Sequence, residues 1–502
     1  MRIQRDFFVG LLLIMAATGA GVSVPGDQAP IQLGSRLELF VDDFLIDRMT
    51  GVRIQMQRPQ SAGQVIAYDQ PWEGNTSWTL SVFKDGDRYR LYYVGRTAPD
   101  YVRKAGLTPA DVVIPEHPNF LCYAESRDGI QWTRPSLGLF EFKGSKNNNI
   151  VTDKGPGTPF LDTNPKAPAS ERYKAVGSTG NNPRWPESLK KDPSAGMLLS
   201  VSEDGLHWRR WKPEPLFRTT LPNAFDSVNV LFWSEAESQY VLYLRYMTQD
   251  IRSFARVTSK DLVQWSEPVP ANFGTAPLEH LYTNAATPYF RAPHLTLAFP
   301  KRYIPIRKRH DDYSIPGISE AVFMTSRDGV HWNEFPEAFI RPGRNDRNWI
   351  HRTTAVAAGV VPTGADEISL FVSRHYTYPS AHIERFTLRT DGFASVTGGY
   401  GGGEFVTKPL TFEGQNLILN YATSAGGSVR VEIQDAEGRP IPGFELERCV
   451  ALWGDEIEGV VRWERAEKAW TDPLPLGRLA EKPVRLRFVL KDADLYSLRF
   501  RP

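Results

Sequence analysis

Short runs in which apolar and polar residues alternate follow one another along most of the chain. They are rich in Val, Tyr, Phe and Thr and lack the period of about 3.6 residues that an amphipathic helix shows, so they predict β-strands. The clearest runs come in pairs, which are 89–94 with 120–125, 173–177 with 197–201, 240–246 with 253–258, 295–299 with 321–325, and 368–373 with 383–388. We therefore expect an all-β protein.

A repeated turn motif follows these strand pairs. It has the pattern Ser-x-Asp-Gly-x-x-Trp, with Leu in place of Gly in the third copy, and its copies are 126–132, 202–208, 259–265 and 326–332, with a degraded fifth at 389–393. The Ser and Asp side chains cap a tight turn, and Gly permits a positive φ. The Trp ring is expected to pack between neighbouring repeats. Five units of about four strands predict a five-bladed β-propeller over residues 31–400, with an irregular array of β-sandwiches as the alternative.

The glycine-rich stretch 398–403 predicts a joint between two domains. New strand-like runs follow it at 416–421, 428–434 and 484–490, without a copy of the turn motif. We therefore expect a small C-terminal β-sandwich over 404–502, so that the whole chain is a five-bladed β-propeller followed by this sandwich.

The first 30 residues predict an export signal and a spacer. Arg2 and Arg5 precede an apolar run over 7–17, and small residues follow at 18–21. An uncleaved N-terminal anchor is the alternative. No other segment approaches the roughly 18 apolar residues of a membrane span. We expect a protein exported to the periplasm or to the outside of a bacterial cell.

Charge and cysteine content exclude several classes of protein. Lys and Arg number 59 against 58 Asp and Glu, a balance that argues against a nucleic-acid partner. The two cysteines, Cys122 and Cys449, exclude a disulfide scaffold and a Cys-rich zinc site, and both are expected to be free buried thiols. No metalloprotease, Ser-hydrolase or phosphate-loop motif occurs, so we expect no cofactor. The exception is a structural Ca²⁺ in the propeller channel, which His280 and His294 would flank.

The turn motif on a five-bladed propeller resembles the glycoside hydrolases of families 32, 43, 68 and 117, over about residues 35–400. The segments 39–46, 279–284 and 491–497 resemble a group of exported bacterial proteins, frequent in planctomycetes, that are labelled family-32-like glycosyl hydrolases. This resemblance implies an exported enzyme that cleaves glycosidic bonds of a plant or algal oligosaccharide or polysaccharide.

Glycosidic cleavage needs one carboxylic acid that stays protonated and a second carboxylate that stays ionised. The resembling hydrolases use an early Asp as base or nucleophile, a mid-chain Asp, and a later Glu as proton donor. Asp226 and Glu279, 53 residues apart, match the last two by their order. Glu73 and Asp43 are the candidates for the first acid, although neither stands in the Asn-Asp-Pro or Asp-Pro signature of those families.

The innermost strands of a propeller converge on one central funnel, and polar or aromatic residues near their starts are expected to bind substrate. In this chain the predicted binding residues are Asp42, Asp162, Asn229, His280, Asn284, Trp349, His351 and Arg352. Trp349 is expected to stack on a sugar ring, and His351 and Arg352 to bind hydroxyls or a carboxylate. The basic segment 301–310 is expected to be a solvated loop, with binding of an anionic glycan as the alternative.

Two other functions stay open. The first is a catalytically silent carbohydrate-binding propeller, which geometry separates from an enzyme: three carboxylates within about 10 Å at the funnel floor indicate catalysis, and dispersed or salt-bridged acids indicate binding. The second is a sialidase-like protein, which needs clustered arginines, and Arg245, Arg291 and Arg352 are available for that role. The sialidase turn motif is one residue longer than the motif found here.

Overall fold

The computed structural model describes residues 29–98, 116–153, 155, 157–178, 196–311, 313, 315–464 and 476–502. Strands dominate these residues, and their helices are the short 3₁₀ turns η1 (Ala169–Glu171), η2 (Asp346–Asn348), η3 (Leu446–Arg448) and η4 (Leu476–Leu479). The all-β prediction is confirmed. The predicted export signal lies outside the described residues except for residues 29 and 30. No helix of the described part of the chain is long and apolar enough to cross a membrane.

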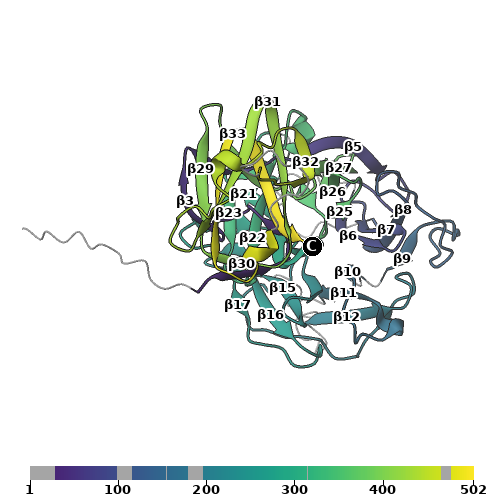
Figure 1. Cartoon of the computed structure of the whole chain (residues 1–502). Coiled ribbons are helices and arrows are strands. Elements are labelled where there is room, and N and C mark those ends of the chain that lie inside the picture. Colours follow the sequence, from purple (N-terminus) through teal and green to yellow (C-terminus); the bar gives the residue numbers. More distant parts are fainter. Residues whose placement is uncertain are drawn as a thin grey trace, which may run out of the picture.

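Five sheets form the blades of a β-propeller within the described residues, as predicted (Figure 1). Blade 1 consists of β6 (Trp78–Asp85), β7 (Arg88–Gly95), β8 (Phe120–Ser126) and β9 (Ile150–Thr152). Blade 2 consists of β10 (Thr158–Leu161), β11 (Tyr173–Ser178), β12 (Met197–Ser202) and β13 (Arg209–Arg210). Blade 3 consists of β14 (Val230–Ser234), β15 (Gln239–Thr248), β16 (Ile251–Ser259) and β17 (Val269–Pro270).

The last two blades depart from the regular four-strand pattern. Blade 4 consists of β18 (His280–Leu281), β19 (Thr287–Tyr289), β20 (Ala292–Ala298), β21 (Lys301–Ile304), β22 (Ile318–Ser326) and β23 (Asn333–Ile340). Blade 5 consists of β24 (Ala355–Val356), β25 (Val361–Pro362), β26 (Glu367–Arg374), β27 (His382–Arg389) and β5 (Gln60–Ala67). Strand β5 comes from the N-terminal side of the chain and pairs with β27, so it closes the ring.

The repeated turn motif has the geometry that its residue types predict. In the first copy, Asp128 Oδ1 accepts hydrogen bonds from the backbone N–H groups of Ile130 and Gln131, each at 2.8 Å. Gly129 has φ 74° and donates its N–H to the Ser126 side chain. The Trp rings pack on the preceding blade: Trp132 meets Phe371 of blade 5 at 5.1 Å between ring centroids. Trp332 likewise meets Tyr243 of blade 3 at 5.6 Å. The motif therefore joins neighbouring blades.

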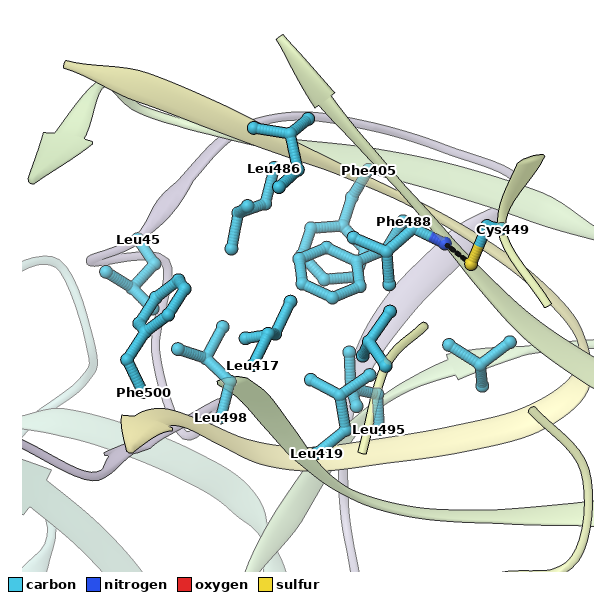
Figure 2. Packing of buried hydrophobic residues seen from close by; sticks show 14 of the residues in the cluster. Leu45, Phe405, Leu417, Leu419, Cys449, Leu486, Phe488, Leu495, Leu498 and Phe500 are labelled. Carbon is cyan, nitrogen blue, oxygen red and sulfur yellow. Dashed lines mark hydrogen bonds between the residues drawn. The ribbon is translucent and has the colours of Figure 1, made fainter. Parts of the chain in front are cut away.

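The remaining strands form one ten-stranded sheet around the apolar core shown in Figure 2. These strands are β1 (Ile31–Gly34), β2 (Glu38–Leu39), β3 (Ile46–Thr50), β4 (Val52–Met56), β28 (Ala394–Gly398), β29 (Gly403–Thr407), β30 (Leu410–Phe412), β31 (Asn416–Asp435), β32 (Asp455–Val460) and β33 (Val484–Arg501). Residues 31–56 and 394–398 thus pair in this second unit, whereas the sequence placed them in the propeller. Alternating polarity predicts that a segment is a strand, but it does not identify the distant strand that will pair with it.

Both cysteines are free and buried, as expected. Cys449 lies in the core of the second unit, where its Sγ accepts a hydrogen bond from the backbone N–H of Val431 at 3.2 Å (Figure 2). Cys122 lies within β8 of blade 1.

Asp391, from the degraded fifth turn motif, connects the second unit to the propeller. Its side chain is buried and accepts hydrogen bonds from the Tyr289 hydroxyl at 2.7 Å and the Arg291 Nε at 2.9 Å, both from blade 4. The Ser497 hydroxyl of β33 donates to its other oxygen at 3.0 Å. The fifth motif has therefore become an interdomain contact.

Candidate active site

A pocket of about 370 Å³ lies where the innermost strands of the propeller begin. Its wall includes residues at or just before the start of an innermost strand in four blades: Trp78 in blade 1, Thr158 in blade 2, Asn229 in blade 3 and Ala355 in blade 5. Blade 4 contributes Tyr282 and Thr283, which follow β18. A second, more apolar pocket is lined by later residues of the innermost strands of blades 1 to 3, together with residues in and around β19 and β25. We call the first one the central pocket.

One carboxylate faces the central pocket among the described residues that line it, and it belongs to Asp226. Its side chain is 39% exposed and accepts a 2.5 Å hydrogen bond from Arg245 Nη1. Its neighbours Phe225 and Ser227 have φ values of 68° and 69°, a conformation that non-glycine residues adopt only when their surroundings impose it. Here Phe225 is fixed on both sides, because its N–H donates to Arg245 O and its carbonyl accepts from Asn229 Nδ2. The turn therefore holds Asp226 toward the pocket.

Basic side chains surround the ring of Tyr282. The guanidinium carbons of Arg252, Arg245 and Arg352 lie 4.8, 5.3 and 5.7 Å from its centroid, and Lys301 Nζ lies 4.7 Å from it. Each of these distances is within the range of a cation–π interaction. We call Arg245, Arg252, Lys301 and Arg352 the cationic cluster. Lys301 and Arg352 line the central pocket, and the Arg245 side chain is 2% exposed.

The charges of this cluster set the protonation state of the pocket. Burial raises the pKa of Asp226, but the charges of Arg245 and Arg352 outweigh it and hold that pKa below its usual range. Asp226 is therefore ionised at neutral pH. For Lys301, burial and the neighbouring charges of Arg352 and Arg245 lower the pKa to about 7. Lys301 therefore changes its protonation state near neutral pH, whereas an ordinary lysine stays protonated there.

Three predicted site residues from blades 3 and 5 lie at this pocket or directly behind it. Asn229 and Arg352 line it. His351 is buried next to Arg352, and its Nδ1 lies 2.7 Å from the Tyr313 hydroxyl. Burial and the charges of Arg352 and Lys301 hold the pKa of His351 well below 6.5, so its ring is neutral.

His280 and Asn284 lie on the blade-4 side of the cluster and do not line the pocket. His280 Nδ1 accepts from the backbone N–H of Arg252 at 3.2 Å, and burial together with the Arg252 charge lowers the pKa of His280. The buried Asn284 side chain accepts from the backbone N–H of Ala286. His294 lies 3.1 Å from Glu38 instead of facing His280. No three His, Cys, Asp or Glu side chains of the described residues are grouped as the ligands of a metal ion would be.

Glu279, the predicted proton donor, lies in a different pocket. Its carboxylate accepts from Arg302 Nη1 at 2.9 Å, and the same guanidinium bonds Glu320 at 2.7 Å. Trp349 also lines this third pocket, and its Nε1 donates to Gly343 O at 2.8 Å. The structure therefore separates Glu279 and Trp349 from Asp226.

Two of the other predicted acids, Glu73 and Asp162, are held in ion pairs elsewhere. Glu73 is buried, accepts from Arg134 at 2.8 Å and is hydrogen-bonded by the Tyr93 hydroxyl. Asp162 accepts from the buried Lys174 at 2.6 Å. These pairs stabilise blade 1 and the contact between blades 2 and 3, where the Tyr240 hydroxyl also bonds Asp162 at 2.8 Å.

Asp42 and Asp43 lie in the segment between β2 and β3. Asp42 accepts from Arg327 Nε at 2.7 Å, so it joins the N-terminal segment to the turn motif of blade 4. Asp43 is exposed. Neither residue lines the central pocket.

Sequence reasoning missed Arg252, Lys301 and Tyr282. Lys301 was expected in a solvated loop, but it lies in β21 and is only 6% exposed. Arg245 was considered with Arg291 and Arg352 for a sialidase-like site. The structure brings Arg245 and Arg352 to Tyr282, whereas Arg291 bonds Asp391 at 2.9 Å. The available signal was a charged residue inside an apolar strand, as in the run 240–247 around Arg245.

No protein-family model and no curated protein matches this chain. Similar solved structures include an N-acetylgalactosamine deacetylase from F. plautii in complex with blood group B trisaccharide, at 12% identity over 68% of this chain and 97% of that one, with a TM-score of 0.43. They also include a β-1,2-mannobiose phosphorylase from Listeria innocua, at 10% identity over 66% and 96%, with a TM-score of 0.42. A GH32 β-fructofuranosidase from Bombyx mori has 10% identity over 87% and 94%, with a TM-score of 0.40. Similarity at this level does not define a substrate or a reaction.

Proposed function

We propose that this protein is an exported carbohydrate-active enzyme that cleaves a glycosidic bond of a plant or algal glycan in the central pocket. The observation that carries this proposal is Asp226. It is a partly exposed carboxylate, held by a strained turn at the axis of a propeller and kept ionised by Arg245. Ionised carboxylates serve as bases or nucleophiles in glycoside cleavage.

The proton for the leaving group would come from Lys301. General acid catalysis works best when the pKa of the donor lies near the working pH, and the pKa of Lys301 is about 7. In this scheme Asp226 attacks the sugar or activates water, and Lys301 protonates the departing oxygen. Asn229, behind Asp226, fixes the turn that presents the carboxylate, because its Oδ1 also accepts from the backbone N–H of Arg245 at 3.0 Å.

A second candidate is a carbohydrate-binding propeller without catalysis. The specific observation in its favour is that Glu73, Asp162 and Asp42 are each engaged by a basic partner outside the pocket. A glycoside hydrolase with two catalytic carboxylates would need a second acid beside Asp226. The sugar-binding role would then belong to Asp226 and Arg352, with Asn229 holding the turn of Asp226.

The test is a turnover and binding screen of the purified chain against oligosaccharides and aryl glycosides. We expect Asp226→Asn to reduce turnover by at least about 100-fold, in the range for loss of a catalytic base. Glu279→Gln, in the separate pocket, is the matched carboxylate control and should leave turnover within about twofold. Loss of turnover in Glu279→Gln but not in Asp226→Asn would contradict the assignment to the central pocket. Binding without turnover by the unmodified chain would establish the second candidate.

A further inference from the structure

We propose that the central pocket binds an oxyanion beside Asp226, held by the cationic cluster and carried either by an acidic glycan substrate or by a free phosphate. The inference deepens the proposed function and rests on it for the sugar, although not for the anion. The anionic group has the chemistry of a carboxylate, a sulfate ester or a phosphate.

Positive charge exceeds negative charge around Tyr282. Three arginines and Lys301 share this ring, and Asp226 is the single carboxylate among the described residues that line the pocket. Bringing like charges together in a buried site costs free energy unless a counter-charge joins them. Four basic groups beside one carboxylate would therefore cost the propeller free energy, and a bound anion would offset that cost.

The cluster also has unused hydrogen-bonding capacity. The Nε atoms of Arg245 and Arg252 are buried and donate no hydrogen bond to the residues that the structure describes, although the Arg245 Nη1 bonds Asp226. Buried donors are nearly always satisfied in folded proteins. A cation–π contact offers these guanidinium groups only part of the stabilisation that a bound anion provides.

The buried amine of Lys301 also lacks a strong partner. Its Nζ has a weak contact with the Arg352 carbonyl, at 3.4 Å, and the residue lines the pocket. Burial and the neighbouring guanidinium charges lower the pKa of Lys301 to about 7, and an anion bound here would raise it. A bound oxyanion would therefore keep the Lys301 amine protonated and accept a hydrogen bond from it.

An anion in this position would orient a sugar. Guanidinium groups bind carboxylates, sulfates and phosphates through paired N–H donors. Asp226, exposed in the same pocket, would then accept hydrogen bonds from sugar hydroxyls or act on the adjoining glycosidic bond. The anion therefore sets which sugar unit faces the carboxylate.

The test is isothermal titration of the full chain with matched ligand pairs. These are oligogalacturonides against their methyl esters, sulfated oligosaccharides against the desulfated compounds, and inorganic phosphate alone. We expect at least one acidic glycan to bind at least tenfold more tightly than its neutral counterpart. Acidic glycan binding without phosphate assigns the anion to the sugar. Binding of phosphate, together with faster glycan cleavage in its presence, assigns it to a free co-substrate. No preference for any anion over its neutral counterpart would overturn the proposal.

Two substitutions test whether the anion binds at the cationic cluster. Lys301→Met keeps the shape of the side chain but removes the charge, and should weaken anion binding at least tenfold without lowering the melting temperature. Arg309→Met is the control, because Arg309 is a half-exposed residue that pairs with Asp346. Equal affinity in the Lys301→Met and unmodified chains would contradict the assignment to the cluster.

The outcome also separates this inference from the proposed function. Acidic glycans that bind but are never cleaved would leave the anion site standing and refute the enzyme. Cleavage that is confined to neutral glycans would support the enzyme and refute the anion site.

Discussion

Lys301 is where the chemistry of the central pocket is most sensitive to pH. The charged and titratable groups that act on it or face it come from blades 3 and 4 and from the segment before blade 5; they are Asp226, Arg245, Arg252, Tyr282, His351 and Arg352. The Asp226 carboxylate and the cation–π contact with Tyr282 favour the protonated amine. Burial and the arginine charges oppose it, and the pKa falls from 10.5 to about 7.

Anion affinity should therefore decrease as the pH rises through about 7. A ligand that requires the charged amine would lose up to about tenfold in affinity for each pH unit above this pKa. Titration calorimetry at pH 6, 7, 8 and 9 would measure it. Lys301→Met should bind weakly with no such pH dependence. An unmodified chain with constant affinity over this range would contradict the role of Lys301.

The same residue affects stability in a defined direction. The unfolded chain binds the Lys301 proton more tightly than the folded chain, because the folded pKa is the lower one. The Lys301 contribution to the free energy of unfolding therefore rises with pH between about 7 and 10.5. Anion binding at pH 6 to 7 should offset part of the free-energy cost of holding the charged Lys301 amine in the folded protein.

Among the elements, the turn motif explains why the blades could be predicted from sequence. In each Ser-x-Asp-Gly-x-x-Trp turn the Ser and Asp side chains accept hydrogen bonds from backbone N–H groups of the same turn. The turn can therefore be predicted from its own residues, without information from the rest of the fold. The third copy shows how far the motif tolerates change, because Leu262 occupies the glycine position with φ 64°. That leucine is buried against blade 3 and its neighbours, and this packing offsets the backbone cost.

Gly329, in the fourth turn, should tolerate no side chain. A Cβ there would lie 2.6 Å from Arg256 Nε and 2.8 Å from the Tyr243 hydroxyl, at φ 75°. We expect Gly329→Ala to lower the free energy of unfolding by about 2–4 kcal/mol, from backbone strain and crowding together.

Gly138→Ala is the control for that measurement. Gly138 has φ 69°, but no atom of the described residues lies within 4 Å of the position that a Cβ would take, so only the backbone cost of about 1 kcal/mol should remain. Chemical denaturation of both variants would compare them. Equal losses would show that crowding at Gly329 does not contribute.

Strand β23 carries a second site where pH and stability are linked. Burial and the charge of Glu279 raise the pKa of Glu334 from 4.5 to about 7. Because the folded pKa is the higher one, the Glu334 contribution to stability is lost as the pH rises from about 4.5 through 7. Glu334→Gln should remove this loss and stabilise the protein by about 1 kcal/mol at pH 8, a value reduced for partial exposure. Denaturation at pH 5 and pH 8 would measure it, with Glu337→Gln, exposed on the same strand, expected to change neither value.

The site was less predictable than the blades, and individual residues show why. Asp226, Asn229 and Arg352 precede innermost strands, so their positions follow from the blade pattern alone. Arg245 and Lys301 lie inside strands, and their approach to Tyr282 depends on how blades 3 and 4 pack together. Glu279 follows Asp226 along the chain as expected, but it lies in a different pocket. The number of residues between two acids does not determine whether their side chains face the same pocket.

For the molecule as a whole, the second unit draws on both ends of the chain. Strand β4 pairs with β28, and β1 pairs with β30. Strand β3 pairs with β29, beside which it lies in Figure 1. The C-terminal part alone would therefore expose unpaired strand edges and apolar core. Sequence could not indicate this, since no local pattern identifies a partner several hundred residues away.

A fragment of residues 403–502 should accordingly fail to fold by itself. We expect it to show no cooperative thermal transition by circular dichroism, whereas residues 29–502 unfold cooperatively. Addition of a peptide spanning 29–58 should restore part of the structure, because it supplies β1–β4. A cooperative transition of the isolated fragment would show that the N-terminal strands are dispensable.

Ring closure by β5 also constrains synthesis of the chain on the ribosome. Ser61 of β5 and its hydrogen-bond partner Glu384 of β27 are 323 residues apart. At a synthesis rate of about 5–20 residues per second, β5 remains unpaired for roughly half a minute before β27 leaves the ribosome. An apolar strand left open for so long would invite association between nascent chains. The first five residues of β5, Gln-Ser-Ala-Gly-Gln, are small or polar and remain exposed in the finished blade, so the waiting strand offers little for another chain to bind.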